Sequence, residues 1–370
     1  MRVVIGAGGT AGHVFPALAT AIRLRERLGA DVRFVGRADG QESTLVPAAG
    51  FPLDTVEAVP FARRLSPATL RAPLVALRAG RRCRAFVREA DVVLGMGGYV
   101  SVPVSLAARR ERVPLVLHEQ NAAPGLANRV AARWARAVAV SFEDSAGRFP
   151  RRAPTVVTGN PVREAIVRVR ATRDALRDEA VRTLDLDPGR RTVVVFGGSQ
   201  GARRLNRAAV GAAGPVVHGA DLQLVLLTGP ALHPEVERAL AGADHVRAVP
   251  FLERMELAYA AADLLVCRAG ATTVAELTVC GLPAILVPYP HATGKHQEAN
   301  ARAIVRAGGA EILSDEQATA DALAHRILSL AGDRERLTSM AGGSAAAGRP
   351  HAADALADVT VSSAREGARG

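Results

Sequence analysis

The chain has 370 residues, and its 47 Lys and Arg against 36 Asp and Glu give a formal net charge of +11. This length predicts two domains, and an apolar content of 49% excludes a wholly disordered chain. The only cysteines are Cys83, Cys267 and Cys280, without CxxC spacing, which excludes a disulfide scaffold and a cysteine zinc site and indicates a reduced, cytosolic protein.

Short apolar runs alternate with longer helical stretches along the chain. Most of these runs are continuous in Val, Leu and Ile, which is typical of parallel strands buried on both faces. The repeated alternation of strand and helix predicts a doubly wound α/β protein. The predicted strands are Arg2–Ala7, Val32–Val35, Val92–Leu94, Leu115–His118, Val138–Ser141, Thr155–Val157, Thr192–Phe196, Leu222–Thr228, Asp263–Cys267 and Ala284–Pro288.

The strand, glycine loop and helix pattern starts twice, at residues 1–28 and again at 191–210. Each half therefore has room for its own Rossmann-like parallel sheet. The turn-forming sequence Gly159-Asn160-Pro161 predicts the boundary, with domains at 1–161 and 162–348. Because ligands of such sheets bind at the carboxyl ends of the strands, we expect the two domains to face a common cleft.

The first glycine loop, Gly6–Gly12, suits a phosphate at the start of a helix. It also fits a loose form of the dinucleotide-binding pattern. The second strand, however, runs into Arg37 without the acidic residue that holds an NAD ribose, which disfavours NAD and leaves NADP open through Arg37. Neither glycine loop is followed by a lysine, which argues against a P-loop NTPase.

His13 lies where this first loop meets its helix. A histidine there suits a general base, because its ordinary pKa lies near neutrality. A helix-capping or merely polar loop residue is the alternative.

Further polar segments follow strands and are expected at the same sheet edges. They are Gly95–Ser101, His118–Asn121, Gly197–Gly201 and His291–Gln297. After the strand ending at Cys267, either Thr272 or Thr273 is predicted to cap a helix, and Glu276 in its first or second turn suits the vicinal hydroxyls of a ribose. A glutamate that serves only the helix dipole is the alternative.

Residues 70–88 mix apolar side chains with six arginines, a composition that suits either an anionic membrane surface or an ordinary surface helix. Pro73 and Gly80 argue against one long helix there.

No apolar run is long enough to span a bilayer, and the N-terminus enters a strand without room for a signal peptide. The Asp185/Asp187 pair lies in a predicted linker, so we predict no metal site.

In this order, the motifs resemble the MurG glycosyltransferase family of peptidoglycan synthesis. The matching segments cover nearly the whole chain and are Gly8–His13, Gly95–Ser101, His118–Asn121, Gly159–Arg163, Gly197–Arg203, Arg268–Glu276 and the stretch from His291 to Gln297. The resemblance implies the GT-B fold, with a C-terminal helix at about 349–366 packing on the first domain. Ala11 departs from the family's usual glycine in the first motif.

The family's activity implies metal-independent, inverting transfer of N-acetylglucosamine (GlcNAc) from UDP-GlcNAc to the muramoyl C4 hydroxyl of lipid I, which forms lipid II. It implies that Ser199 meets the diphosphate, Glu276 the ribose, and the loop at Leu252 the uracil. His13 and Glu119 are the catalytic candidates. The predicted substrate-binding residues are Thr10, Ala11, Gly12, Asn121, Arg163, Ser199, Leu252, Ala271, Thr272, Thr273, Val274, Ala275, Glu276 and Gln297.

The same resemblance implies no cofactor, no nucleic acid, and a peripheral location on the cytoplasmic face of the cell membrane, with cell-wall synthesis and division proteins as possible partners. Because Lys295 is the only lysine among the basic residues, we attribute the arginine excess to coding bias, not to nucleic-acid binding. Three alternatives stay open: another GT-B transferase with a different lipid or natural-product acceptor, a non-enzymatic protein that binds a nucleotide sugar, and an NADP oxidoreductase.

Overall fold

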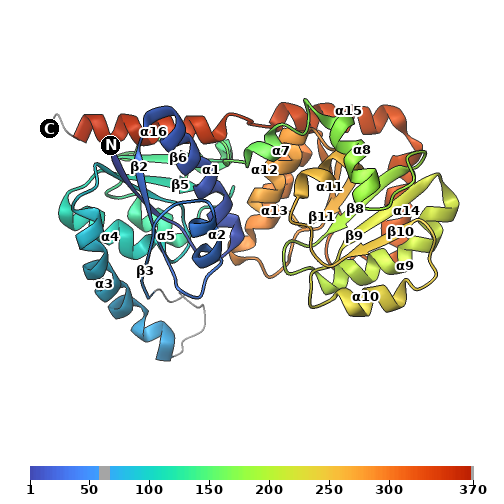
Figure 1. Cartoon of the computed structure of the whole chain (residues 1–370), viewed down its shortest axis with the longest axis horizontal. Helices are drawn as coiled ribbons and strands as arrows, with labels where there is room; N and C mark the ends of the chain where they lie inside the picture. Colours follow the sequence, from blue (N-terminus) through green and yellow to red (C-terminus); the bar gives the residue numbers. More distant parts are fainter. Residues whose placement is uncertain (58–66, 368–370) are drawn as a thin grey trace. The chain divides into compact units, whose positions relative to one another are not determined.

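The computed structural model describes residues 1–57 and 67–367. The chain divides into two compact units (Figure 1). Unit 1 comprises Met1–Arg163 together with Pro350–Gly370, and unit 2 comprises Glu164–Arg349.

Unit 1 is built on a parallel sheet of seven strands in the order β3-β2-β1-β4-β5-β6-β7. The interior strand β1 pairs on both sides, so that Val3 lies opposite Val32 on β2 and Val92 on β4. The strands are β1 (Arg2–Gly6), β2 (Asp31–Gly36), β3 (Leu53–Thr55), β4 (Val92–Gly95), β5 (Leu115–Glu119), β6 (Ala137–Val140) and β7 (Thr155–Val157).

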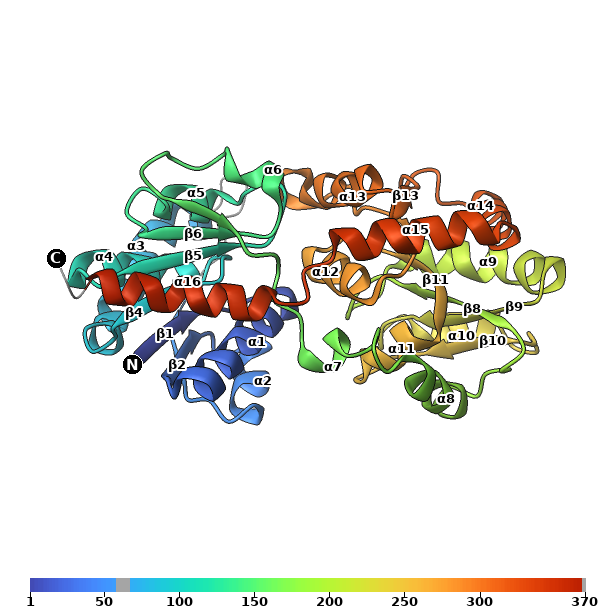
Figure 2. The same cartoon turned by 90° about the horizontal axis from the view of Figure 1, so that it is seen from above.

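Helices cover both faces of this sheet. One hydrophobic core joins the sheet to α1 and α16, and a second joins the opposite face to α3 and α4. Figure 2 shows α16 running along the sheet over β4 and β5. The helices are α1 (Ala11–Leu28), α2 (Glu42–Ala48), α3 (Pro67–Val87), α4 (Ser101–Glu111), α5 (Leu126–Ala131), α6 (Glu143–Ala146) and α16 (Ala352–Gly367).

Unit 2 repeats the plan with a parallel sheet of six strands in the order β10-β9-β8-β11-β12-β13. A core on one face of this sheet is completed by α9 and α14. The strands are β8 (Arg191–Phe196), β9 (Leu222–Leu227), β10 (Val246–Val249), β11 (Ala262–Cys267), β12 (Ala284–Leu286) and β13 (Ala310–Ile312). The helices are α7 (Glu164–Val167), α8 (Arg173–Thr183), α9 (Arg203–Gly219), α10 (His233–Ala239), α11 (Met255–Ala261), α12 (Ala271–Cys280), the 3-10 turn η1 (Thr293–Lys295), α13 (His296–Arg306), α14 (Ala320–Gly332) and α15 (Arg334–Ala347).

All ten predicted strands are present, within a few residues at their ends. Three further strands, β3, β10 and β13, escaped prediction. Each has three or four residues, forms an edge of its sheet and is only partly buried. An edge strand needs no continuous apolar run, because one side of it borders solvent.

The expectation that Pro73 and Gly80 would interrupt the helix at residues 70–88 was wrong, because α3 is a single helix from Pro67 to Val87. Gly80 faces α4, where a methyl group at this position would lie at an ordinary contact distance of 3.4 Å from the carbonyl oxygen of Pro103. Of residues 70–74 and 76 only the backbone is described. No helix within residues 1–57 and 67–367 is long and apolar enough to cross a bilayer.

The last helix, α16, is fastened to unit 1 by charge as well as by its apolar face. Arg27 on α1 donates to Asp354 at 2.9 Å, and the Arg23 side chain lies 3.4 Å from the same carboxylate. Leu356 and Ala357 are fully buried in the core between α16 and the sheet. The end of the chain therefore completes the domain in which it begins.

Candidate functional site

His13 lies in the first turn of α1, directly after the glycine loop that follows β1. Its Nδ1 shares a hydrogen bond of 3.1 Å with Thr10 Oγ1. The ring packs against the loop after β4, where methyl groups at Gly97 and Gly98 would lie 3.6 Å from ring atoms. If Nδ1 carries the proton and donates to Thr10, the lone pair lies on Nε2, which is the tautomer that a general base requires.

The helix begins after Thr10, whose side chain makes no capping hydrogen bond. His13 is the third helical residue, so it is not itself the N-cap residue. Gly97 and Gly98 in the loop after β4 adopt φ values of +83° and +71°, a backbone conformation that favours glycine.

The polar residues at the end of β5 and directly after it, His118, Glu119 and Gln120, are buried. Glu119 is 3% exposed, and its carboxylate accepts from the amide N–H groups of Asn121 and Gly125, both at 3.0 Å, and from Asn128 Nδ2 at 2.9 Å. Burial raises its pKa, although these hydrogen bonds oppose the shift. The Glu119 side chain therefore shapes the loop that carries Asn121, which itself remains half-exposed.

His118 is fully buried beside this loop, with Nε2 3.1 Å from the carbonyl oxygen of Gly159. Burial lowers the pKa of His118 to about 4, so the ring is neutral at physiological pH. The hydrogen bond ties the end of β5 to the segment after β7, which leads to Arg163. The guanidinium of Arg163 lies 4.4 Å from the centre of the Phe15 ring on α1. The segments predicted in unit 1 thus meet at one sheet edge.

In unit 2, Ser199 is exposed in the glycine loop between β8 and α9. This loop is packed closely against the end of β9, because a methyl group at Gly201 would overlap the carbonyl oxygen of Thr228. Asn206 Nδ2 on α9 donates to the same oxygen at 2.8 Å. The tight packing accounts for glycine at position 201, where φ is +74°.

Glu276 lies in the second turn of α12 and is 6% exposed. Tyr259 Oη on α11 donates to Glu276 Oε2 at 2.7 Å, and burial, reinforced by this carboxylate, raises the pKa of the tyrosine well above its usual value. The predicted capping role of the threonines was wrong: Gly270 is the N-cap residue, and Thr272 and Thr273 lie inside the first turn. Gly270 has the extended backbone conformation that is usual for an N-cap residue.

The remaining donor candidates also follow strands of unit 2. Leu252 is half-buried in the loop after β10, next to Phe251, which is 57% exposed. Gln297 is the second residue of α13, and its Oε1 accepts from the Tyr289 amide at 2.9 Å. This bond orients the amide of Gln297, with its oxygen toward the loop after β12. Residues 271–275 form the start of α12, from Ala271 through Val274 and Ala275.

Sequence reasoning missed two supporting side chains in unit 2. Tyr259, described above, holds Glu276 from another helix. Arg268, 8% exposed at the end of β11, donates to the Val287 carbonyl at 3.0 Å and lies 2.6 Å from Asp315. Arg268 begins the predicted motif Arg268–Glu276, but nothing in the spacing of that motif indicates that the arginine anchors the loop after β12. Tyr259 carries no sequence signal at all.

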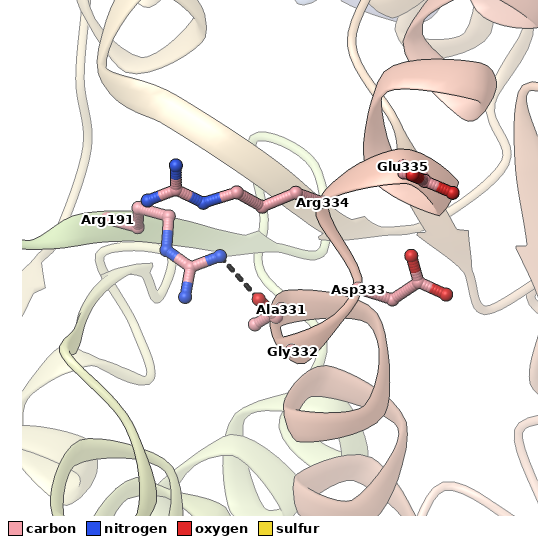
Figure 3. Close-up of a pocket in the computed structure, with 6 residues that line it drawn as sticks. All are labelled: Arg191, Ala331, Gly332, Asp333, Arg334 and Glu335. Carbon is pink, nitrogen blue, oxygen red and sulfur yellow. Dashed lines mark hydrogen bonds between the residues drawn. The ribbon is translucent and has the colours of Figure 1, made fainter.

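A cavity of about 620 Å³ in unit 2 lies away from these loops (Figure 3). Its wall includes Arg191, the first residue of β8, so it is at the amino edge of the sheet, whereas Ser199 follows the carboxyl end of the same strand. Arg191 donates to the Ala331 carbonyl, as Figure 3 shows. The remaining lining residues are Gly332, Asp333, Arg334 and Glu335.

Within the part of the chain that the structure describes, no three His, Cys, Asp or Glu side chains are grouped to hold a metal ion.

Comparison with known families covers both units. The family described as glycosyltransferase family 28 N-terminal domain matches residues 3–140, and the one described as glycosyltransferase family 28 C-terminal domain matches residues 192–356. The UDP-N-acetylglucosamine--N-acetylmuramyl-(pentapeptide) pyrophosphoryl-undecaprenol N-acetylglucosamine transferase of Acidothermus cellulolyticus is 46% identical over 98% of both chains. The enzyme of the same name from Nocardia farcinica is 44% identical, over 99% of this chain and 96% of its own.

Solved structures agree with this assignment. The crystal structure of Acinetobacter baumannii MurG superposes with a TM-score of 0.77 at 30% identity, covering 98% of this chain and 99% of that one. The calicheamicin glycosyltransferase CalG4 has a TM-score of 0.67 at 17% identity, with 98% of each chain covered, and therefore shares the fold alone. The predicted GT-B architecture of two parallel-sheet α/β domains is confirmed.

Proposed function

The chain belongs to the MurG family within glycosyltransferase family 28, and from this premise we propose that it transfers GlcNAc from UDP-GlcNAc to lipid I to form lipid II. The observation that carries this proposal is the extent of the similarity, which runs through both domains at 46% identity. A natural-product transferase of the same fold shares only 17% identity, so another acceptor is less well supported.

We propose that unit 2 holds the nucleotide sugar. The residues assigned by resemblance follow β8, β10, β11 and β12, whose carboxyl ends share one edge of the sheet. Ser199 then contacts the diphosphate, Glu276 the ribose and Leu252 the uracil, while Gln297 contacts the sugar. Arg163 contributes to the donor site as well. The half-buried or buried settings of Glu276 and Gln297, each held by a hydrogen bond, support preorganised recognition.

For the chemical step, we propose that His13 Nε2 removes the proton from the C4 hydroxyl of the muramoyl sugar. The hydroxyl oxygen then attacks the anomeric carbon, the bond from that carbon to the diphosphate oxygen breaks, and its electron pair leaves with UDP. Attack from the opposite side inverts the anomeric centre. Thr10, Ala11 and Gly12 at the start of α1 are proposed to meet substrate phosphates, because backbone N–H groups at a helix start favour negative charge. Glu119 acts indirectly, by holding the loop that presents Asn121.

This function is tested by incubating purified protein with labelled UDP-GlcNAc and a lipid I analogue, with and without EDTA. We expect label in the lipid product and an equal amount of UDP, at the same rate in both arms. Donor hydrolysis or binding without transfer would reject the acceptor, and loss of transfer in EDTA would reject the metal-independent mechanism.

We also propose that α3 binds the anionic membrane surface that carries the acceptor lipid. Leu77 is 57% exposed on this helix, and Arg78, Arg81 and Arg82 are exposed beside it. An apolar side chain among arginines suits the interface of an anionic bilayer.

Reversing two of these charges, in Arg81→Glu with Arg82→Glu, is expected to weaken binding to anionic vesicles by at least about 30-fold, since the loss of each arginine near the surface removes about 1 kcal/mol and each glutamate adds repulsion. Co-sedimentation with vesicles measures this loss. The matched control reverses Arg170 and Arg182, two exposed arginines of unit 2, and so has the same net charge. Equal loss in both variants would mean that net charge alone, not α3, governs binding.

A further inference from the structure

Glu42 is a fully buried carboxylate beneath the first glycine loop of unit 1. It is the first residue of α2. Its Oε1 accepts from the Arg37 amide at 2.9 Å, and the Gly9 amide lies 3.3 Å from Oε1 and 3.2 Å from Oε2. A carboxylate is stable in the interior only where hydrogen-bond donors of the protein replace the water that it loses. The buried Glu42 side chain therefore needs the Arg37 and Gly9 amides.

The space for this carboxylate is made by glycines on separate segments. A methyl group at Gly8, in the loop after β1, would overlap Oε1, and one at Gly40, before α2, would overlap Oε2. At Gly36, the last residue of β2, a methyl group would lie 2.5 Å from Cγ of Glu42. Three positions without side chains thus surround one carboxylate.

Gly9 is also confined from its other side. Its φ is +95°, and a methyl group there would lie 3.0 Å from Tyr99 Oη. That hydroxyl accepts from Arg37 Nη1 at 2.9 Å. Gly9 therefore sits between the Glu42 carboxylate and the Tyr99 ring, directly before Thr10 and the helix that carries His13.

We propose that Glu42 is a positioning residue for glycosyl transfer, which holds Gly9 and so sets the direction in which Thr10 and His13 enter α1. The inference rests on the proposed role of His13 as the base. It also has a consequence for substrate binding: the Gly9 amide is directed at a protein carboxylate, so phosphate contacts in this loop fall to residues 10–12. Glu42 itself does not touch the reacting atoms.

The test begins with Glu42→Gln, which keeps the size of the side chain. Its NH₂ group would replace Oε2, so that two donors face each other at the Gly9 amide. We expect kcat to fall about tenfold, with the KM for UDP-GlcNAc unchanged because the donor residues lie mainly in unit 2. Amide hydrogen exchange across residues 9–12 should accelerate. Glu111→Gln is the matched control, since it removes an ion pair with Arg84 far along α4 from this loop.

A second variant, Gly40→Ala, adds a methyl group that would overlap Oε2 and so displaces the Glu42 carboxylate. The sequences of Glu42 and of the first glycine loop stay unchanged. Its control is Gly147→Ala, where nothing lies within 4 Å of the added methyl group and φ is −70°. If Gly40→Ala acts through Glu42, its loss of kcat and that of Glu42→Gln should combine to less than their product in the double variant.

The outcomes separate this inference from the proposed function. If the wild-type protein transfers no GlcNAc, the proposed function is rejected. The hydrogen-exchange measurement then still tests whether Glu42 holds residues 9–12 in place. An active wild type with an unchanged kcat in Glu42→Gln overturns the positioning role. So does an equal loss in Glu111→Gln, when each variant is assayed well below its own Tm. Unchanged exchange at residues 9–12 in both Glu42→Gln and Gly40→Ala overturns the structural premise.

Discussion

His13→Ala is expected to lower kcat by about 10²- to 10⁴-fold, the range that a positioned general base contributes. The imidazole is the group that we propose takes the proton from the acceptor hydroxyl, and its ring is oriented by Thr10 Oγ1 at 3.1 Å. UDP affinity, measured by calorimetry, should stay within a few-fold of the wild type, because the proposed nucleotide contacts lie mainly in unit 2. Steady-state transfer with a lipid I analogue gives kcat.

Thr10→Val separates base chemistry from simple packing. Valine keeps the shape of the side chain but removes the hydroxyl group that shares a hydrogen bond with His13 Nδ1. A smaller loss of kcat, about tenfold, is expected. If His13→Ala turns over at the wild-type rate, the base assignment is wrong, whatever Thr10→Val does.

Glu276→Ala is expected to weaken UDP-GlcNAc binding by roughly 10²-fold, because hydrogen bonds to a charged group contribute about 1.5–3 kcal/mol each. At saturating donor, kcat should change little, since the proposed ribose contact would be made equally in the ground state and the transition state. Calorimetric titration with UDP measures the loss directly. Wild-type affinity in this variant would refute the ribose assignment.

The buried partner of Glu276 complicates that substitution and supplies its control. Alanine leaves the Tyr259 hydroxyl buried without its acceptor, which costs about 1–3 kcal/mol of folding free energy. Tyr259→Phe removes the hydroxyl and keeps the carboxylate. We expect it to lower UDP affinity only several-fold, so a loss as large as that of Glu276→Ala would indicate that packing in unit 2, not the ribose contact, had been measured.

Local pattern and ordered motifs were enough to predict the doubly wound fold and the enzyme family. The central strands could be read from the sequence because a strand buried on both faces is a continuous apolar run, as at Val193–Phe196. The edge strand Ala310–Ile312 could not, because it is short, partly exposed and interrupted by Glu311. The continuity of α3 through Gly80 was visible only in the folded chain, where this glycine faces α4.

The candidate site divides in the same way. Placing His13, Ser199 and Glu276 after strands required only the rule that parallel strands end at one edge. Their hydrogen-bonding partners required the folded chain, because Tyr259 and Glu42 approach from helices whose positions are set by packing, not by neighbouring sequence. Sequence by itself thus determined which chemical groups stand at the strand ends. Only the tertiary structure decided which of them turn inward as supports, as Glu119 and Glu42 do, because burial and long-range hydrogen bonds exist only after the sheets and helices have packed.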